Sequence, residues 1–249
     1  MTVFSPEDRA RVRERVLEVA RADPRVSGGA ITGSVAVGAE DRWSDVDTSF
    51  GVADSVDPEA VLEEWTEVLT PELGVLHHWD LRSGATIYRV YLLRGGLELN
   101  IAVTPAAEFG ARGPRFQLVF GEGAELPPVD PPRVDELVGY GWLYAINTRT
   151  AIERAKPWQA EYFISCLRNH ALALACVRLG QPAVYGRGFD LLPSDVTGPY
   201  EEALVRSLEP DELRRALAVA AAEFLREVER FDPGLARRLK EPLGELTAP

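Results

Sequence analysis

The segment ELPPVDPPR, residues 125–133, constrains the fold more than any other part of this 249-residue chain. It contains four prolines in nine residues. Because proline fixes φ and lacks an amide donor, such a segment is a semi-rigid connector rather than part of a helix or sheet. The sequence before it is rich in strand patterns, whereas the sequence after it has helical periodicity. We therefore expect two domains, over residues 1–125 and 134–249.

The first half predicts an α/β (α+β) domain with a mixed sheet. A helix is expected to begin at Ser5, whose hydroxyl can cap it, with Pro6 at the first helical position. A second helix is expected over residues 57–70. Extended stretches are expected at residues 29–32, 45–52, 74–79, 86–93 and 97–103. Gly95 and Gly96, between the last two stretches, suit a two-residue hairpin turn.

The second half predicts an α-helical bundle. Helices are expected over residues 134–154, 158–179, 199–207 and 210–231, with a short final helix after Pro233. Cys166 and Cys176 fall within one of these helices, where ten residues of separation correspond to roughly 15 Å of rise. They cannot pair with each other there, so free thiols in a reducing compartment are expected.

Composition and charge exclude several classes of protein. A net charge of −12 argues against a broad nucleic-acid surface, which needs a basic face. No apolar run approaches the roughly 20 residues that span a bilayer, and the charged N-terminus, MTVFSPEDRARVRER, lacks the apolar core of a secretory signal. We expect a cytoplasmic protein, monomeric or homodimeric, with no nucleic-acid or membrane partner.

The segment TGSVAVGAEDRWSDVDTSFGV, residues 32–52, concentrates the residues that can carry chemistry. Asp45 and Asp47 are two apart on an expected strand, so their carboxylates project from one face and repel each other when both are ionised. A divalent cation removes this conflict, and oxygen ligands favour Mg²⁺ or Mn²⁺ over zinc. Gly33 allows a tight turn, and the amides and hydroxyl at Ser34 can hold phosphate oxygens.

Metal and phosphate binding together indicate a nucleoside triphosphate, ATP or another NTP. Ser44, in the spacer, can cap locally and orient the aspartates. The chain has neither the Gly-x4-Gly-Lys-Ser/Thr loop nor the Gly-x-Gly-x-x-Gly order of other nucleotide sites. Gly-Ser and Asp-x-Asp each occur by chance in many loops. A strand followed by Gly-Ser, a spacer and Ser-Asp-x-Asp at the start of a second strand is much more specific.

With this motif the sequence resembles the nucleotidyltransferase superfamily, which includes polymerase-β-like enzymes and the aminoglycoside and lincosamide nucleotidyltransferases. The resemblance rests on residues 32–52, on GLELNIAVTPAAEFGARGPRFQLVFG (96–121) and on WQAEYFISCLRNHALALACVRLG (158–180). It implies a mixed-sheet catalytic domain, a helical domain that closes over the acceptor, and transfer of a nucleoside monophosphate with release of pyrophosphate. By the same resemblance, Gly33 and Ser34 bind the triphosphate. Asp45 and Asp47 bind the catalytic magnesium ions.

The sequence departs from this superfamily at Asn100. Such enzymes place a third carboxylate on a neighbouring strand, and Asn100 in LELNIAV is the position that best matches it. An asparagine offers a neutral carbonyl oxygen, so it can contact a metal but cannot accept a proton. The second metal is therefore expected to bind more weakly. Glu98, two residues earlier on the same strand face, can partly substitute.

Two explanations of Asn100 stay open. In one, a glutamate of the helical domain activates the acceptor hydroxyl. Glu161 is the candidate, because Trp158, Glu161 and Arg168 lie near one helix face and offer an aromatic wall, a base and a phosphate partner. In the other, catalysis is lost and nucleotide or metal binding is retained.

The leading hypothesis is transfer of AMP from MgATP to a hydroxyl of a small aminoglycoside- or lincosamide-like acceptor. A catalytically impaired binding or regulatory protein and a protein adenylyltransferase are the alternatives. Other candidate residues are weaker: Tyr140, Trp142 and Tyr144 are expected to be mostly core aromatics, one of which could stack on a base or sugar.

Overall fold

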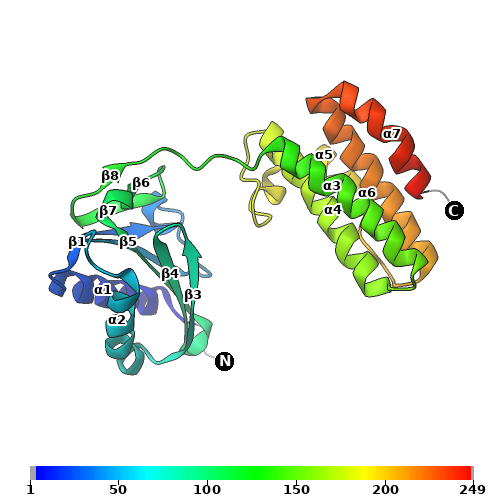
Figure 1. Cartoon of the computed structure of the whole chain (residues 1–249). Helices are drawn as coiled ribbons and strands as arrows, with labels where there is room; N and C mark the ends of the chain where they lie inside the picture. The colour runs from blue at the N-terminus through cyan, green and yellow to red at the C-terminus, as the bar shows by residue number, and fades with distance from the viewer. Residues whose placement is uncertain (1–3, 248–249) are drawn as a thin grey trace. The chain divides into compact units, whose positions relative to one another are not determined.

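The computed structural model describes residues 4–247, which divide between Val129 and Asp130 into two compact units (Figure 1). The division falls inside the proline-rich segment 125–133. Each unit has its own hydrophobic core. The predicted fold class, a mixed-sheet domain followed by a helical one, is confirmed.

A six-stranded sheet forms the centre of the first unit, with the order β3-β4-β5-β2-β1-β7. The pair β2–β5 is parallel and the other neighbours are antiparallel, so the sheet is mixed. A short parallel pair, β6–β8, lies outside it. The strand bounds are β1 Val26–Thr32, β2 Val46–Val52, β3 Val75–Ser83, β4 Thr86–Leu93, β5 Glu98–Pro105, β6 Gly110–Ala111, β7 Phe116–Gly121 and β8 Ala124–Glu125.

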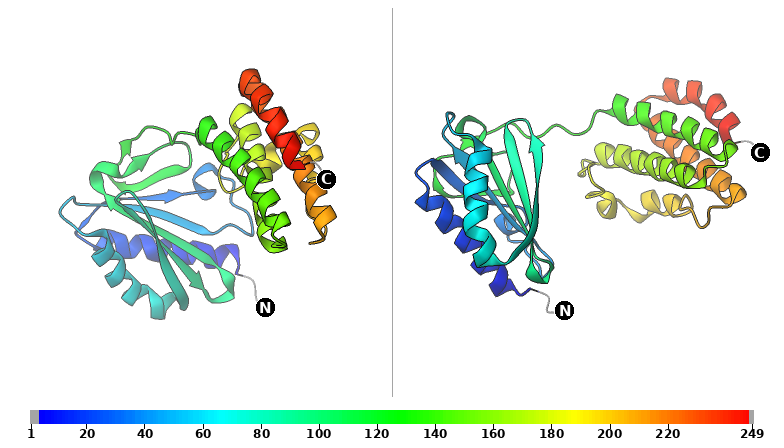
Figure 2. Two further views of the ribbon diagram at one scale, coloured as in Figure 1. Left: turned by 45° about the vertical axis from the view of Figure 1, so that its right-hand side comes forward. Right: turned by 60° about the horizontal axis from the view of Figure 1, so that its bottom comes forward.

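Two helices, α1 (Pro6–Ala22) and α2 (Pro58–Leu73), cover one face of this sheet, as Figure 2 shows. Ser5 and Asp8 form the capping box that begins α1. Phe50 of β2 packs edge-on against Trp65 of α2, with ring centroids 5.1 Å apart. Because side chains alternate along a strand, the neighbours of Phe50 in sequence point to the opposite face, which the two helices leave uncovered.

The connection between β4 and β5 differs from the predicted two-residue turn. The amide of Leu93 donates to the carbonyl of Leu97 at 2.9 Å, which closes a loop of three residues, Arg94–Gly96. Gly95 and Gly96 both have positive φ, +84° and +82°. The two-residue prediction is wrong because Arg94 also takes part in the turn.

Among the described residues the second unit has five α-helices, and they enclose a core of alanine, leucine and aromatic side chains. Their bounds are α3 Val134–Glu153, α4 Pro157–Arg178, α5 Ser194–Glu201, α6 Pro210–Phe231 and α7 Pro233–Thr247. Gly141 lets α3 approach α6 closely, since a Cβ there would lie 2.2 Å from the Phe224 ring. A bidentate ion pair joins Arg178 of α4 to Glu227 of α6, at 2.8 and 2.9 Å.

The helix predicted over residues 199–207 is displaced. It is α5, which begins five residues earlier, at Ser194, and holds Pro199 in its interior rather than in its first turn. The buried ring of Tyr200 anchors this helix to the core, so tertiary packing sets its position. Within residues 4–247 no helix is long and apolar enough to cross a membrane.

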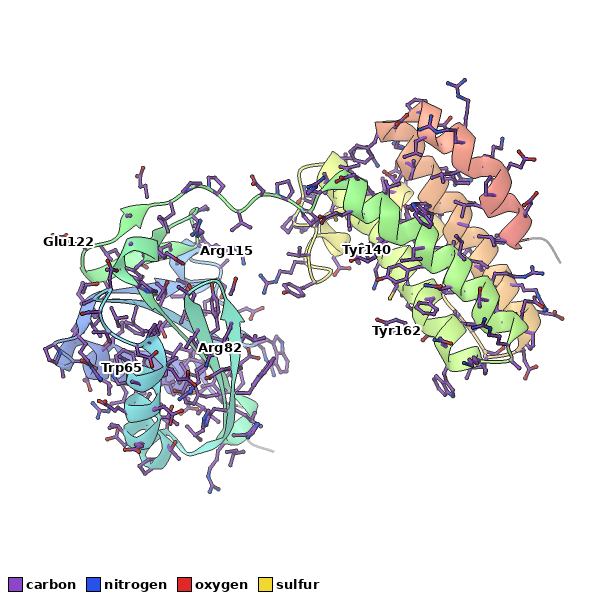
Figure 3. All side chains as sticks on the ribbon, viewed as in Figure 1. Trp65, Arg82, Arg115, Glu122, Tyr140 and Tyr162 are labelled. Atoms are coloured by element: carbon purple, nitrogen blue, oxygen red, sulfur yellow. The ribbon has the colours of Figure 1, made fainter. Side chains whose placement is uncertain are left out.

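Asp23 ties the end of α1 to α2. Its carboxylate accepts hydrogen bonds from Arg25 Nη2 at 2.7 Å and from the indole Nε1 of Trp65 at 2.9 Å. Figure 3 labels Trp65, which α2 carries. The hydrogen bonds from Arg25, more than the opposing effect of burial, lower the pKa of Asp23 from 3.8 to about 2. The folded unit therefore favours the ionised carboxylate.

We expect Asp23→Asn to lower the free energy of unfolding of the first unit by about 2 kcal/mol near neutral pH. Because the pKa of Asp23 is depressed in the folded state, this stabilisation is complete above pH 3.8 and is lost as the pH falls towards about 2. Urea unfolding, followed by hydrogen exchange in peptides of α2, measures the difference at several pH values. A difference that does not shrink on acidification would contradict this assignment.

Candidate functional site

The parallel pairing of β2 with β5 brings the predicted acidic residues together. Val46 is opposite Leu99 and Asp47 is opposite Asn100. Val46 and Leu99 are fully buried towards the helices, so Asp47 and Asn100 project from the other face of the sheet. Asp45 comes immediately before β2 and lies beside them.

The side-chain amide of Asn100 is the centre of this group. Its Nδ2 donates to Asp47 Oδ1 at 3.0 Å, to Glu98 Oε1 at 3.1 Å and to Asp45 Oδ2 at 3.2 Å. An amide nitrogen carries two hydrogens, so three acceptors share them. The four predicted residues therefore converge on one point, with the neutral amide between three carboxylates.

Gly33 makes room for Asp47. Its φ is +75°, and a Cβ built there would lie 2.1 Å from Asp47 Oδ2. The residue is therefore required to be glycine for two reasons, the left-handed backbone and the contact with the carboxylate. The Gly-Ser turn and the Asp-x-Asp motif, separated in sequence, form one packed unit in the structure.

Ser34 and Ser44 lie side by side across the loop that joins β1 to β2. Ser34 Oγ donates to Ser44 Oγ at 3.2 Å. Ser44 Oγ in turn donates to Asp41 Oδ1 at 3.1 Å and accepts from the Asp41 amide at 2.9 Å. Hydrogen bonding from the Trp43 amide is the main cause that lowers the pKa of Asp41. Two hydroxyls are thus held together by the loop's own hydrogen bonds.

The donor set fits a hard divalent cation. Asp45 and Asp47 offer carboxylate oxygens, and the Asn100 amide offers its carbonyl oxygen once it is turned about its last torsion. Nitrogen and sulfur ligands, which zinc and copper prefer, do not take part in this group. Within residues 4–247 no set of three histidine, cysteine or acidic side chains is arranged to hold a metal ion by itself, Asp45, Asp47 and Glu98 included. The two aspartates and Asn100 are therefore the residues that would bind Mg²⁺ or Mn²⁺.

Glu161 and Arg168 lie in the second unit, on α4. Ser165 connects them, because its Oγ donates to Glu161 Oε1 at 2.7 Å and accepts from Arg168 Nη2 at 3.3 Å. Burial lowers the pKa of Arg168 from its usual value. Trp158, predicted near the same face, is 75% exposed. The structure thus joins Glu161 and Arg168 in one polar row along the helix.

The aromatic residues of α3 are less buried than the sequence predicts. Tyr140 is 51% and Trp142 is 39% exposed, so for these two the prediction of core packing is wrong. Figure 3 shows Tyr140 on α3 and Tyr162 on α4 at the surface of the unit. Tyr144 stacks on Tyr140 with centroids 5.9 Å apart and contacts His170 of α4. These rings cover the seam between α3 and α4 instead of filling its interior.

An apolar patch beside the acidic group was not predicted. Val90 of β4 pairs with Asn100, and Trp79 of β3 pairs with Val90, so all three share one face of the sheet. Trp79, Tyr88 and Leu92 are 52%, 41% and 47% exposed. The period-two pattern of β4 in the sequence contained this signal, because it places Tyr88, Val90 and Leu92 on one side.

No protein-family model matches the sequence, and no curated protein matches it. Solved structures do. An aminoglycoside 6-adenyltransferase from Bacillus subtilis is 12% identical and matches over 97% of this chain and 99% of its own, with a TM-score of 0.43. A nucleotidyltransferase-like protein from Exiguobacterium sibiricum is 13% identical over 89% of this chain and 76% of its own, with a TM-score of 0.39.

The structure of a GLD-2/RNP-8 complex is also matched, with 13% identity over 90% of this chain and 80% of that one and a TM-score of 0.34. An adenyltransferase and a nucleotidyltransferase-like protein are thus among the solved structures to which this chain is similar. This concerns the fold alone. At these TM-scores the similarities carry no argument about activity, metal or substrate.

Gly33→Ala is expected to weaken Mn²⁺ binding by about 10- to 100-fold, because the added methyl group displaces the Asp47 carboxylate. Gly38→Ala is the matched control. Gly38 has a similar φ of +67°, but apart from Gly38 itself and its two chain neighbours no atom of the described chain lies within 4 Å of its Cβ position. Both variants carry the same backbone strain, and only the first disturbs Asp47. Titration calorimetry with Mn²⁺ measures the two affinities, and equal losses would contradict the role of the contact.

Proposed function

We propose that this chain is a nucleotidyltransferase that transfers AMP from MgATP to a hydroxyl group of a small-molecule acceptor. The observation that carries the proposal is the convergence of Asp45, Asp47 and Asn100 on one face of the sheet, directly against the Gly33 turn. This arrangement combines ligands for a hard cation with a backbone turn that can approach phosphate oxygens closely.

Different residues of the site bind the metal ion and the phosphate groups of the nucleotide. Asp45 and Asp47 would hold Mg²⁺, which would supply positive charge to offset the charge of the triphosphate and of the leaving pyrophosphate. To bind phosphate oxygens, Ser34 and Ser44 would turn their hydroxyl hydrogens away from Ser44 Oγ and Asp41 Oδ1, while the Asp41 amide continues to donate to Ser44 Oγ. The acceptor oxygen attacks the α-phosphorus in line, and the bond from that phosphorus to the pyrophosphate oxygen breaks.

The attacking hydroxyl must give its proton to a base, and Asn100 cannot accept it. Glu98 and Glu161 are the two candidates. Glu98 Oε1 is already 3.1 Å from Asn100 Nδ2 within the first unit. Glu161 carries a hydrogen bond from Ser165 that would hold its carboxylate in one orientation. Arg168, in the same polar row, is proposed as a phosphate ligand.

The chemistry of the acceptor side follows from the patch formed by Trp79, Tyr88 and Leu92. Exposed aromatic rings next to carboxylates suit a molecule with a ring face and a hydroxyl, such as an aminoglycoside- or lincosamide-like compound. We propose that these side chains contact the acceptor.

Asn100 also favours a second function, that of a catalytically impaired nucleotide-binding protein on the same scaffold. Its amide satisfies Asp45, Asp47 and Glu98 with hydrogen bonds, as a third acid would not. Adenylylation of a partner protein is the remaining alternative, because a protein hydroxyl can replace the small-molecule acceptor.

Transfer is tested with Mg²⁺, each of four α-labelled nucleoside triphosphates, and a panel of aminoglycosides, lincosamides and cell extract. Asp47→Asn is expected to lower the rate of labelled product formation by at least about 100-fold, since one charged metal ligand is lost. Asp54→Asn, in the exposed loop after β2, is the control and should leave the rate unchanged. Transfer that appears only in Asn100→Asp would support the impaired site.

Binding is followed separately by thermal stabilisation. Stabilisation by ATP that needs Mg²⁺, without turnover in any assay, would favour the binding protein. If neither the wild type nor Asn100→Asp is stabilised by any nucleotide, the proposed function is wrong.

The base is identified by comparing Glu98→Gln with Glu161→Gln, two changes that keep side-chain shape and remove the proton acceptor. The variant that lacks the base is expected to lose about 10²- to 10⁴-fold in kcat, with ATP affinity retained. The other variant should remain within a few-fold of the wild type. Equal, small effects in both would show that neither glutamate is the base.

A further inference from the structure

We propose that Arg9 and Arg13 of α1 are positioning residues for the phosphate-binding hydroxyls. They hold Glu40, and through it they fix the loop that carries Ser34 and Ser44. This inference rests on the proposed function, because the hydroxyls matter only if they bind a triphosphate. Neither arginine belongs to the motif at residues 32–52.

Two guanidinium groups converge on one carboxylate oxygen. Arg9 Nε and Arg13 Nη1 each donate to Glu40 Oε1 at 3.2 Å. The side chains of Arg9, Arg13 and Glu40 are 2%, 18% and 27% exposed, so the group is screened from bulk water. Glu40 lies in the loop between β1 and β2, whereas both arginines come from α1, the helix that precedes β1 in the sequence. The contact therefore fixes the loop to the helical layer.

Glu40 is the carboxylate that accepts a hydrogen bond from the Arg9 guanidinium. Its Nη1 is buried and has no hydrogen-bond partner within residues 4–247, and its guanidinium lies 5.7 Å from the centroid of the Phe4 ring. A buried cation that loses its carboxylate partner is strongly destabilised. Movement of Glu40 away from Arg9 would leave such a cation, so the loop is held in one position.

The constraint passes from Glu40 to the two hydroxyls through its neighbour, Asp41. The Asp41 amide donates to Ser44 Oγ and the Asp41 carboxylate accepts from it, at 2.9 and 3.1 Å. Ser44 Oγ accepts from Ser34 Oγ at 3.2 Å. The Ala39 amide also donates to the Ser34 carbonyl at 2.9 Å, which closes the loop on itself. An unbroken row of bonded groups thus runs from α1 to Ser34.

Glu40→Gln tests the inference, because it keeps the side-chain shape and removes the charge. We expect the Kd for MgATP to rise by at least about tenfold, with kcat at saturating ATP within about twofold of the wild type. Hydrogen exchange of the amides in residues 33–44 should become faster. Arg13→Gln should act in the same direction, and it avoids the risk that a change at the buried Arg9 prevents folding.

Glu72→Gln is the matched control. Glu72 of α2 accepts two hydrogen bonds from Arg15 of α1, at 2.6 and 3.0 Å, so this variant also removes the carboxylate partner of an α1 arginine, but away from the loop. It should change neither the Kd for MgATP nor exchange in residues 33–44. Calorimetric titration with MgATP and mass-spectrometric hydrogen exchange provide readouts that do not depend on turnover.

The outcomes separate this inference from the proposed function. If the wild type binds MgATP and Glu40→Gln binds it as well as Glu72→Gln does, the positioning role is overturned while the proposed function stands. If the wild type binds no nucleotide, the proposed function fails, and the role of the arginines fails with it. If Glu40→Gln and Arg13→Gln raise the Kd for MgATP and speed exchange in residues 33–44, and Glu72→Gln does neither, the result supports the positioning role and the binding of nucleotide.

Discussion

The parallel register of β2 and β5 is the constraint on which the candidate site depends. It places Asp47 opposite Asn100, and the buried residues Val46 and Leu99 prevent either strand from shifting by one position. Such a shift would turn the apolar side chains of the core to the open face. The hydrophobic core on one face of the sheet therefore determines which side chains meet on the other face. The positions of Asp47 and Asn100 relative to each other depend on apolar packing.

The local patterns in the sequence predicted most of the elements. Ser5 with Pro6 marked the start of α1, and the proline-rich segment 125–133 contains the point where the structure divides. The start of α1 was predictable because capping depends on residues a few positions apart. The start of α5 was missed, since the burial of Tyr200 against other helices decides it.

Of the candidate site, the sequence predicted which residues share a sheet face but not how they touch. Gly33 contacts Asp47, and one amide donates to three carboxylates, only because separate strands pair in the sheet. The link between Arg9 and Glu40 joins residues 31 positions apart, for which no local spacing rule exists. The exposure of Trp79 next to the acids depends likewise on the strand order. Long-range contacts of this kind appear only when the sheet is assembled.

The amide at Asn100 has a thermodynamic consequence for the folding of the first unit. Its NH₂ group donates hydrogen bonds to three carboxylate oxygens, whereas an aspartate there would add a further negative charge that a cation must balance. An acid at this position would couple folding to the concentration of divalent ions. With asparagine this further charge is absent, so folding of the first unit needs no cation to offset it, and removal of divalent ions with a chelator is expected to leave the unit folded.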